Sequence, residues 1–364
     1  YGVNAQTKHI ILADRKTLKC PNGIVLGTPG SGKSFFAKRE MANAFFATPD
    51  HILILDAENE YTALTEQLHG QTIYLAPDSQ SYLNPMDLDL STDVGESPML
   101  MQADFLLSQC ELMMASYGNP LMPIEKSLID RCISLVYRDY LKNPRPENMP
   151  ILGDLYQCLR EQHNSRADDL ATAMEIYVTG SLSYLNHRTN VDLNNRMVCY
   201  NISKLGQGLK KLVMSNVQKH IWQRTAVNRY AGITTRIFLD EFHLLLKEPQ
   251  TAAYTAEIYK RFRKWNGIPT SLTQNVKDLL DSSEIENILE NSDFVLMLNQ
   301  GASDRNILAQ RLGISPQELN HVTNSGEGEG LLFFGDKIIP FEDKFPRDTQ
   351  LYRVMTTKPS DLAA

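Results

Sequence analysis

The sequence predicts an α/β fold with a mostly parallel central sheet, helices on both faces and an inserted all-helical subdomain. Three observations predict it. Short apolar runs that end in glycine or a carboxylate lie at residues 23–27, 51–56 and 236–241, as in buried parallel strands. Segments with helical spacing follow such runs. Between residues 99 and 186, leucine, methionine, isoleucine and alanine recur at three- and four-residue spacing, which is typical of packed helices.

The first apolar run leads into a glycine-rich loop. Gly23-Ile-Val-Leu-Gly27 precedes Thr-Pro-Gly-Ser-Gly-Lys-Ser34, and a helical pattern runs from Phe35 to Ala47. This order of strand, loop and helix predicts a phosphate-binding loop, because glycines let backbone N–H groups cradle phosphate oxygens at a helix N-terminus. We expect Lys33 to reach the β- and γ-phosphates and Ser34 to ligate Mg²⁺. The predicted nucleotide-binding residues are Thr28, Pro29, Gly30, Ser31, Gly32, Lys33, Ser34 and Phe35.

Two later runs end in acids, as does the strand that accompanies a phosphate loop. They are His51-Ile-Leu-Ile-Leu-Asp56 and Arg236-Ile-Phe-Leu-Asp240-Glu241. We predict that Asp240 holds the Mg²⁺ shell and that Glu241 orients and deprotonates the attacking water. A surface pair of turn acids is the alternative. The tandem acids favour a hydrolysing motor over a switch GTPase, and the sequence has no guanine-binding NKxD motif.

Three further polar residues are candidates for the same cleft. Glu58 and Glu60 follow the first acidic run, although acids at a helix N-terminus explain them equally well. Gln274 ends the run 268–274, and its amide is predicted to sense the γ-phosphate by hydrogen bonding. Capping of the next helix is the alternative explanation for Gln274.

A basic segment places four cations in five positions, namely Lys260, Arg261, Arg263 and Lys264. A solvated helix end, favoured by the helix dipole, would account for it. The functional hypothesis is an arginine finger, in which Arg263 stabilises the phosphoryl group held by a neighbouring subunit. A third interpretation is contact with nucleic-acid phosphates. Arg261 and Arg305 are the competing residues for the finger.

The spacing of the acids predicts the domain organisation. Asp56 and Asp240 are 184 positions apart, more than a compact nucleotide-binding core needs. We therefore predict a core in two parts, residues 1–90 and 193–364, around a helical insertion at residues 91–192. Turn-rich, acidic residues 83–87 and 91–98 mark its entry. Three prolines, Pro144, Pro146 and Pro150, interrupt its helical pattern. A glycine-rich loop near residue 328 is expected to precede a closing strand or hairpin.

Composition narrows the class of protein. The 364 residues carry a formal net charge of -7, whereas a generic nucleic-acid binder is usually basic. Residues 40–125 hold fourteen acids and no Lys or Arg, and residues 193–239 hold eight Lys or Arg and no acid. Two solvated faces, or a head-to-tail ring in which one flank meets the other, are the alternatives.

Five scattered cysteines without a CxxC pair indicate neither a zinc site nor a disulfide framework, which suits a reducing cytosol. The first residue, Tyr1, suggests a fragment with a preceding part.

Taken in order, these landmarks resemble the VirB4 family, the conjugation ATPases of bacterial type IV secretion systems, TraE/TrsE-like members included. The resemblance covers nearly the whole chain and corresponds to the C-terminal ATPase domain of the family. The segments that carry it are residues 22–34, 54–61, 83–85, 237–243, 263–267 and 273–275.

The resemblance implies a RecA-like P-loop NTPase core related to the conjugation coupling proteins and to the FtsK and HerA translocases. It implies ATP/ADP and Mg²⁺ as cofactors, and hexamers or smaller oligomers at the cytoplasmic, inner face of the cell membrane. Other secretion components and the coupling protein would be partners, with membrane contact made through them or through the family's N-terminal domain. The family's motif positions fall on Lys33, Ser34, Asp240, Glu241, Gln274 and Arg263.

Three functional hypotheses follow. The first is an ATP-hydrolysing motor that powers assembly of a secretion apparatus or substrate transfer. The second is a DNA-translocating ATPase with the basic stretch 193–239 in a ring channel and DNA as a partner. The third is a nucleotide-gated structural subunit of the channel. The acidic net charge weighs against the second hypothesis, and the acid pair at 240–241 weighs against the third.

Overall fold

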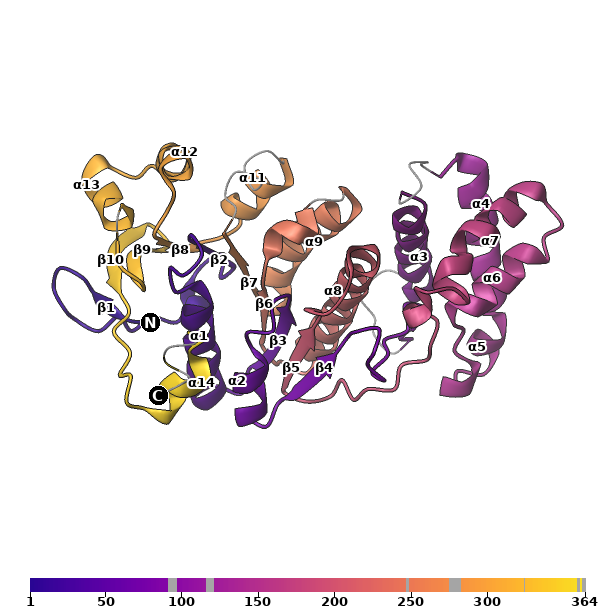
Figure 1. Ribbon diagram of the computed structural model, residues 1–364, viewed down its shortest axis with the longest axis horizontal. Coiled ribbons are helices and arrows are strands. Elements are labelled where there is room, and N and C mark those ends of the chain that lie inside the picture. Colours follow the sequence, from indigo (N-terminus) through magenta and orange to yellow (C-terminus); the bar gives the residue numbers. More distant parts are fainter. Residues whose placement is uncertain are drawn as a thin grey trace. The chain divides into compact units, whose positions relative to one another are not determined.

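The computed structural model in Figure 1 describes residues 1–90, 97–115, 121–246, 249–274, 283–323, 325–358 and 361. Its chain forms two compact units. Unit 1 comprises residues 1–72, 194–201 and 228–364, and unit 2 comprises residues 73–193 and 202–227. These boundaries differ from the predicted domain limits of 90 and 192, which stay a prediction. Among the described helices, none combines the length and the apolarity needed to span a bilayer.

Unit 1 is built on one mixed sheet. Its strand order is β1-β10-β9-β8-β2-β7-β6-β3-β5-β4, and β4 carries the chain out of the unit. The six strands from β8 to β5 in this order run parallel, whereas β9, β10 and β1 add an antiparallel edge. The strands are β1 (Val3–Asn4), β2 (Gly23–Leu26), β3 (His51–Asp56), β4 (Gln71–Tyr74), β5 (Met197–Asn201), β6 (Thr235–Leu239), β7 (Gly267–Thr273), β8 (Phe294–Leu298), β9 (Glu329–Phe334) and β10 (Lys337–Glu342). The prediction of a mostly parallel α/β sheet is confirmed.

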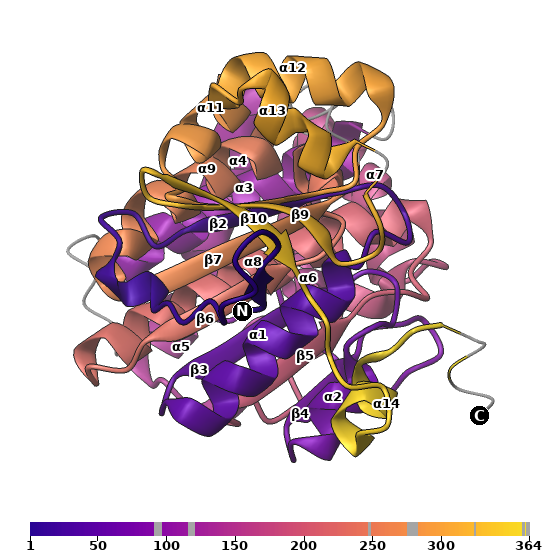
Figure 2. The same cartoon turned by 90° about the vertical axis from the view of Figure 1, so that its left-hand side faces the viewer.

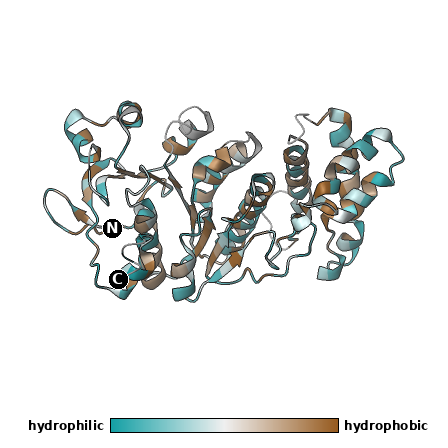
Figure 3. Cartoon of the chain, viewed as in Figure 1, coloured by the Kyte–Doolittle hydropathy of each residue, from teal (hydrophilic) through white to brown (hydrophobic). Residues whose placement is uncertain are grey.

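Helices cover both faces of this sheet. Figure 2 shows α1 and α2 on one face and α9 and α11 on the other. The helices of unit 1 are α1 (Lys33–Ala47), α2 (Thr62–Gln67), α9 (Pro249–Phe262), α11 (Ser283–Glu290), α12 (Ala302–Leu312), α13 (Pro316–Leu319) and α14 (Gln350–Met355). Because both faces are covered, the central strands are buried along their whole length rather than on alternate residues, and they are largely brown in Figure 3.

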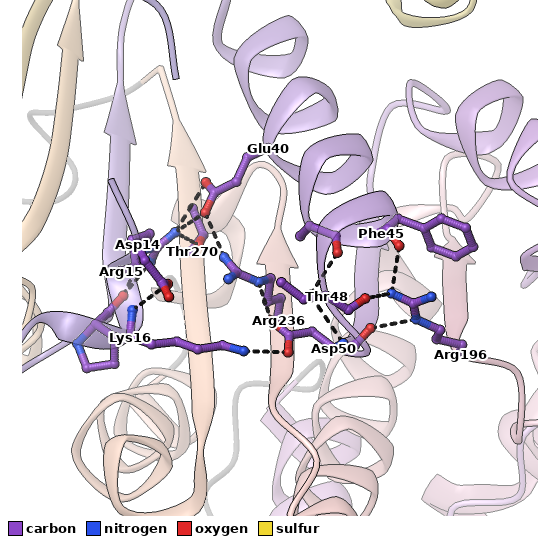
Figure 4. A network of polar contacts seen from close by, with 12 residues as sticks. Asp14, Arg15, Lys16, Glu40, Phe45, Thr48, Asp50, Arg196, Arg236 and Thr270 are labelled. Carbon is purple, nitrogen blue, oxygen red and sulfur yellow. Dashed lines mark hydrogen bonds and ion pairs between the residues drawn. The ribbon is translucent and has the colours of Figure 1, made fainter. Parts of the chain in front are cut away.

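A buried ion cluster fixes α1 against the strands beneath it (Figure 4). Glu40 of α1 accepts hydrogen bonds from Arg15 Nη1 at 3.0 Å and from Arg236 Nη1 at 3.2 Å. Arg15 also donates to Thr270 Oγ1 at 2.7 Å, and Arg236 donates to Asp50 Oδ2 at 2.9 Å. The side chains of Arg15, Glu40, Asp50 and Arg236 are at most 6% exposed. The cluster therefore joins α1 to β6, to β7 and to the loops before β2 and β3.

The cluster bears on the charge asymmetry of the sequence. Glu40 and Asp50 belong to the acidic stretch, and Arg236 belongs to the basic one, yet they pair within one chain. Arg196 is also committed, because its guanidinium donates to the carbonyls of Phe45, Thr48 and Asp50. These charges are not available to a neighbouring subunit, so the asymmetry alone is weaker support for a head-to-tail interface than the sequence suggests.

Unit 2 is helical and surrounds the irregular segment 83–88. Its helices are α3 (Pro98–Ala115), α4 (Pro123–Val136), α5 (Arg138–Lys142), α6 (Leu152–Arg160), α7 (Ser165–Val178) and most of α8 (Gln207–Tyr230). Because segment 83–88 has no strand or helix partners, side chains satisfy its buried carbonyls. Five side chains donate to them, namely Gln102 of α3, Tyr137 between α4 and α5, Tyr140 of α5, and Asn216 and Lys219 of α8.

Removal of the central carboxylate of the ion cluster should destabilise the fold. We expect Glu40→Ala to lower the free energy of unfolding by about 3–5 kcal/mol, since it takes from two buried guanidinium groups the carboxylate that they share. Urea titration followed by circular dichroism measures this loss. The control is Lys16→Ala, which removes a partner of Asp50 that is 34% exposed and should cost less than about 1 kcal/mol. Equal losses in the two variants would contradict the role of Glu40.

A second stability prediction concerns Lys219 of unit 2. Burial lowers the pKa of this ammonium from 10.5 to about 7. Between pH 7 and 10 the unfolded chain keeps the proton that the folded chain has lost, so stability rises with pH in this window. The contribution is about 1.4 kcal/mol per pH unit, and Lys219→Met should abolish it. Urea midpoints of both proteins at pH 7, 8 and 9 test this, and parallel pH profiles would refute it.

Candidate active site

The phosphate loop lies where the sequence places it, between β2 and α1. Gly30 and Gly32 have φ angles of 74° and 101°, in the left-handed region that favours glycine. Gly32 caps α1 without a side chain, so the first amides of the helix stay open toward the loop. The backbone is therefore shaped to receive an anion at a helix N-terminus.

Lys33 lies across this loop. Its ammonium donates to the carbonyls of Gly27 at 2.8 Å and of Thr28 at 3.1 Å. Burial lowers the pKa of Lys33, and the charges of three neighbouring acids, Glu241, Asp240 and Glu60, oppose that shift. The lysine predicted to bind phosphate is thus close to the acids predicted to serve the metal and the water.

The acids come from the carboxyl ends of adjacent parallel strands, which meet at one edge of the sheet. Asp240 follows β6, and its backbone N–H donates to Leu55 O of β3 at 3.1 Å. Asp240 is 5% exposed. Burial, and then repulsion by Glu60, Glu241 and Asp56, raise the pKa of Asp240 well above its usual range. A bound cation would relieve this crowding, so the site suits a metal ion.

Glu241 has two polar neighbours, one of which donates a hydrogen bond to it. Gln274 Nε2 donates to Glu241 Oε1 at 2.8 Å, and His243 Nδ1 lies 3.0 Å from Glu241 Oε2. Burial alone would raise the pKa of Glu241, but His243, Lys33 and Gln274 outweigh it and bring the pKa below its ordinary value. Glu241 also has a φ of 45°, which is strained for a residue with a side chain. This strained carboxylate is therefore ionised where it lines the cavity, and its oxygens can accept a hydrogen bond from a water.

One cavity of about 760 Å³ collects most of the predicted residues. Those that line it are Pro29, Gly30, Gly32, Lys33, Ser34, Phe35, Glu58, Glu60, Asp240, Glu241 and Gln274. Two members of the predicted nucleotide-binding set do not line it. Thr28 donates its N–H and its hydroxyl to Asn299 O, and the side chain of Ser31 is buried beneath the loop. Asn275, which ends the last landmark, lies outside the described residues.

The candidate arginines lie elsewhere. Arg263 is exposed just before β7, at the amino edge of the sheet, with its Nη1 3.3 Å from Cys20 Sγ. Seven residues of strand, at roughly 3.3 Å each, separate it from the carboxyl edge that carries the cavity. Arg261 pairs with Glu257 one helical turn away. Arg305 lies near the start of α12 and does not line the cavity. Arg263 thus lies at the edge of the sheet away from the phosphate loop of its own chain, whereas Arg305 follows β8 at the carboxyl edge without lining the cavity.

Sequence reasoning missed one wall of the cavity. The chain after β10 returns to the phosphate loop and contributes Asp343, Lys344, Phe345, Arg347, Tyr352, Thr356, Thr357 and Lys358. Sequence reasoning also missed His243, the partner of Glu241. These residues belong to no phosphate-loop motif. Two aromatic and four basic residues within residues 344–358 were the available signal.

Among the described residues, no group of three or more His, Cys, Asp or Glu side chains could hold a metal ion. This sparse set fits Mg²⁺, which typically takes one or two protein ligands and completes its shell with waters and substrate phosphates. Ser34 and Asp240, which line the same cavity, are the residues that would hold it.

Comparison with known proteins places the chain. The family model described as the TraG P-loop domain matches residues 11–326. VirB4 of Thermoanaerobacter pseudethanolicus has a similar structure, with a TM-score of 0.85 at 23% identity over 96% of this chain and 97% of that chain. Plasmid coupling protein TrwB in complex with ADP and Mg²⁺ is similar with a TM-score of 0.57 at 13% identity, over 91% and 87% of the two chains. No curated protein matches. The structural likenesses show a shared fold.

Two substitutions should separate nucleotide binding from the chemical step. Lys33→Ala removes the cation that faces the phosphates, so we expect ATP binding to fall below detection while the circular dichroism spectrum stays unchanged. Glu241→Gln is nearly isosteric and should keep ATP affinity while lowering the turnover rate by at least about a hundredfold. Isothermal titration and phosphate release measure the two quantities. Glu66→Gln, on α2 and outside the cavity lining, is the matched control. Unchanged ATP affinity of Lys33→Ala would contradict the site.

Proposed function

The chain belongs to the family of TraG P-loop domains, P-loop ATPases of conjugation and type IV secretion systems, and we propose that it hydrolyses ATP to power assembly or substrate transfer by such a system. One observation carries the proposal of hydrolysis. The ionised Glu241 is held by Gln274 in the same cavity as the phosphate loop.

The geometry supports a role for each residue. The loop amides and Lys33 would hold the phosphates of ATP, and Ser34 with Asp240 would hold Mg²⁺, which neutralises charge on the phosphates. Glu241 would orient a water and accept its proton. Gln274 donates a hydrogen bond to Glu241, so its amide would link the position of the Glu241 carboxylate to the presence of the γ-phosphate. The strained backbone of Glu241 would fix the direction in which its carboxylate points before nucleotide binds.

Arg263 is our candidate for a residue that acts on a neighbouring subunit. It is exposed and lies at the edge of the sheet away from its own cavity. A guanidinium in that place cannot serve its own chain, but in a head-to-tail oligomer the amino edge of one sheet can face the cavity of the next. Arg305 remains the comparison residue.

The basic stretch 193–239 bears on which cargo the motor moves. Of the eight cations in the basic stretch 193–239, Arg196, Lys219 and Arg236 are buried or bonded within the chain. That reduces the charge available for a DNA channel, so we place secretion or assembly before DNA pumping.

The test is the ATPase rate per subunit across protein concentrations, with and without duplex DNA at fixed salt. We expect a rate that climbs with concentration and does not respond to DNA, because the proposed finger comes from another subunit. Mixing Arg263→Ala with wild-type protein should lower the rate by more than dilution does, and the same mixture with Arg305→Ala should not.

Three outcomes would argue against parts of this proposal. No hydrolysis at any concentration would favour a nucleotide-gated structural subunit. Strong stimulation by DNA would move the DNA pump to first place. A mixture with Arg263→Ala that behaves as simple dilution would remove the trans assignment, and poisoning by Arg305→Ala instead would transfer it to that residue.

A further inference from the structure

The cavity extends past the phosphate loop to the segment that follows β10. The acids that suit the metal and the water, Asp240 and Glu241, come from the end of β6. The C-terminal wall brings aromatic side chains instead, and neither the hydrolytic chemistry nor the phosphate loop uses them.

Three aromatic rings meet at this wall. Phe35, one residue after Ser34, has its ring centroid 5.8 Å from that of Phe345 and 5.4 Å from that of Tyr352. Arg39 lies one helical turn beyond Phe35 on α1, and its guanidinium is 5.4 Å from the centroid of Phe345. One face of α1 is thus covered by residues 343–352 directly beside the phosphate loop.

A buried carboxylate belongs to the same wall. The side chain of Asp343 is 4% exposed, and its Oδ1 pairs with Arg39. Its Oδ2 is buried without a hydrogen-bond partner among the described residues. A buried acceptor of this kind costs free energy unless a donor reaches it. Since Asp343 lines the cavity, a ligand bound there can supply that donor.

We infer that the segment 343–358 forms the nucleoside subsite of the cavity, with the base against the rings of Phe345 and Tyr352 and an N–H or O–H group of the nucleoside donated to Asp343. The inference rests on the proposed ATPase function. A nucleotide whose phosphates lie on the first amides of α1 extends its sugar and base away from them, and aromatic faces beside that point are suited to stacking. A volume near 760 Å³ accommodates a ligand of this size.

The test compares two ligands that share phosphates and differ in the base. Isothermal titration measures the affinities of Mg²⁺–ATP and of Mg²⁺–tripolyphosphate, which has no nucleoside. Phe345→Leu keeps an apolar side chain but removes the ring, and Phe345→Tyr keeps the ring. Because stacking on an aromatic ring contributes about 1–3 kcal/mol, we expect Phe345→Leu to weaken ATP at least about fivefold. Tripolyphosphate should bind both variants as it binds wild type.

The outcomes are distinct. Selective loss of ATP affinity in Phe345→Leu, with Phe345→Tyr close to wild type, supports the subsite. Equal losses for the two ligands, or no loss for either, overturn it. Wild-type protein that binds neither ligand would refute the proposed function instead.

The part of Asp343 is tested with ligands rather than by disrupting the fold. Inosine triphosphate lacks the amino group of adenine, and 2′-deoxy- and 3′-deoxy-ATP each lack one hydroxyl group. Loss of a hydrogen bond to a charged acceptor should weaken one of them about tenfold or more relative to ATP. Asp343→Asn should shrink that difference. If all three analogues bind wild type as ATP does, the assignment of Asp343 is wrong.

Discussion

The carboxylate of Glu40 is the interaction on which the rest of unit 1 depends. It receives two buried guanidinium groups, Arg15 from the loop before β2 and Arg236 from β6. Buried charges are tolerated only when paired and hydrogen-bonded, so the cluster fixes α1 to β6 and, through Thr270, to β7. α1 begins at the phosphate loop, and these two strands end at the acids and at Gln274. The cluster therefore sets the depth and rotation of the helix relative to the residues that share its cavity. Even Gly23 reflects it, since a Cβ there would lie 2.4 Å from Arg15 Nη2.

The parallel strand order then determines which residues meet. β2, β7, β6 and β3 are consecutive in the sheet, although nearly two hundred residues separate β3 from β6 in the chain. Their carboxyl ends share one edge, so the phosphate loop, Gln274, Asp240 and Glu60 converge without any local sequence relation. The same geometry places Arg263 at the opposite edge. The predicted nucleotide site at one edge and the exposed Arg263 at the other both follow from this topology. This separation is the reason we propose that Arg263 acts on a neighbouring subunit.

How far the sequence could predict this arrangement depends on the range of each signal. The phosphate loop, the acidic strand ends and the apolar runs are local patterns, so the parallel α/β core and the phosphate and acidic sides of the cavity could be predicted from them. Arg15 could not, because a lone arginine in a loop gives no sign that it will be buried against Glu40 and Phe294. Residues 83–87 are predicted as a turn-rich entry to the insertion, but the role of segment 83–88 as the polar centre of unit 2 depends on donors from α3, α5 and α8 and from Tyr137. The C-terminal wall was missed because aromatic and basic residues in a tail are ordinarily surface residues, and only the return of the chain after β10 brings them to the loop.

The charge of the residues that line the cavity affects how a triphosphate can bind there. Its lining holds six carboxylates and four cations, a formal charge of -2 before any phosphate enters. Two of the cations, Lys344 and Lys358, are already paired with Glu342 and Glu327. Of the other two cations, Arg347 is exposed to solvent, whereas Lys33 donates to a carbonyl of the phosphate loop. A triphosphate that approaches such a site is repelled unless positive charge accompanies it. A divalent cation on Asp240 offsets part of this repulsion, and a guanidinium from another subunit can offset more of it as charge moves onto the leaving oxygens. On this argument we propose that the acid-rich cavity of one chain binds nucleotide together with its metal, and that the cation needed for fast hydrolysis comes from a neighbouring subunit.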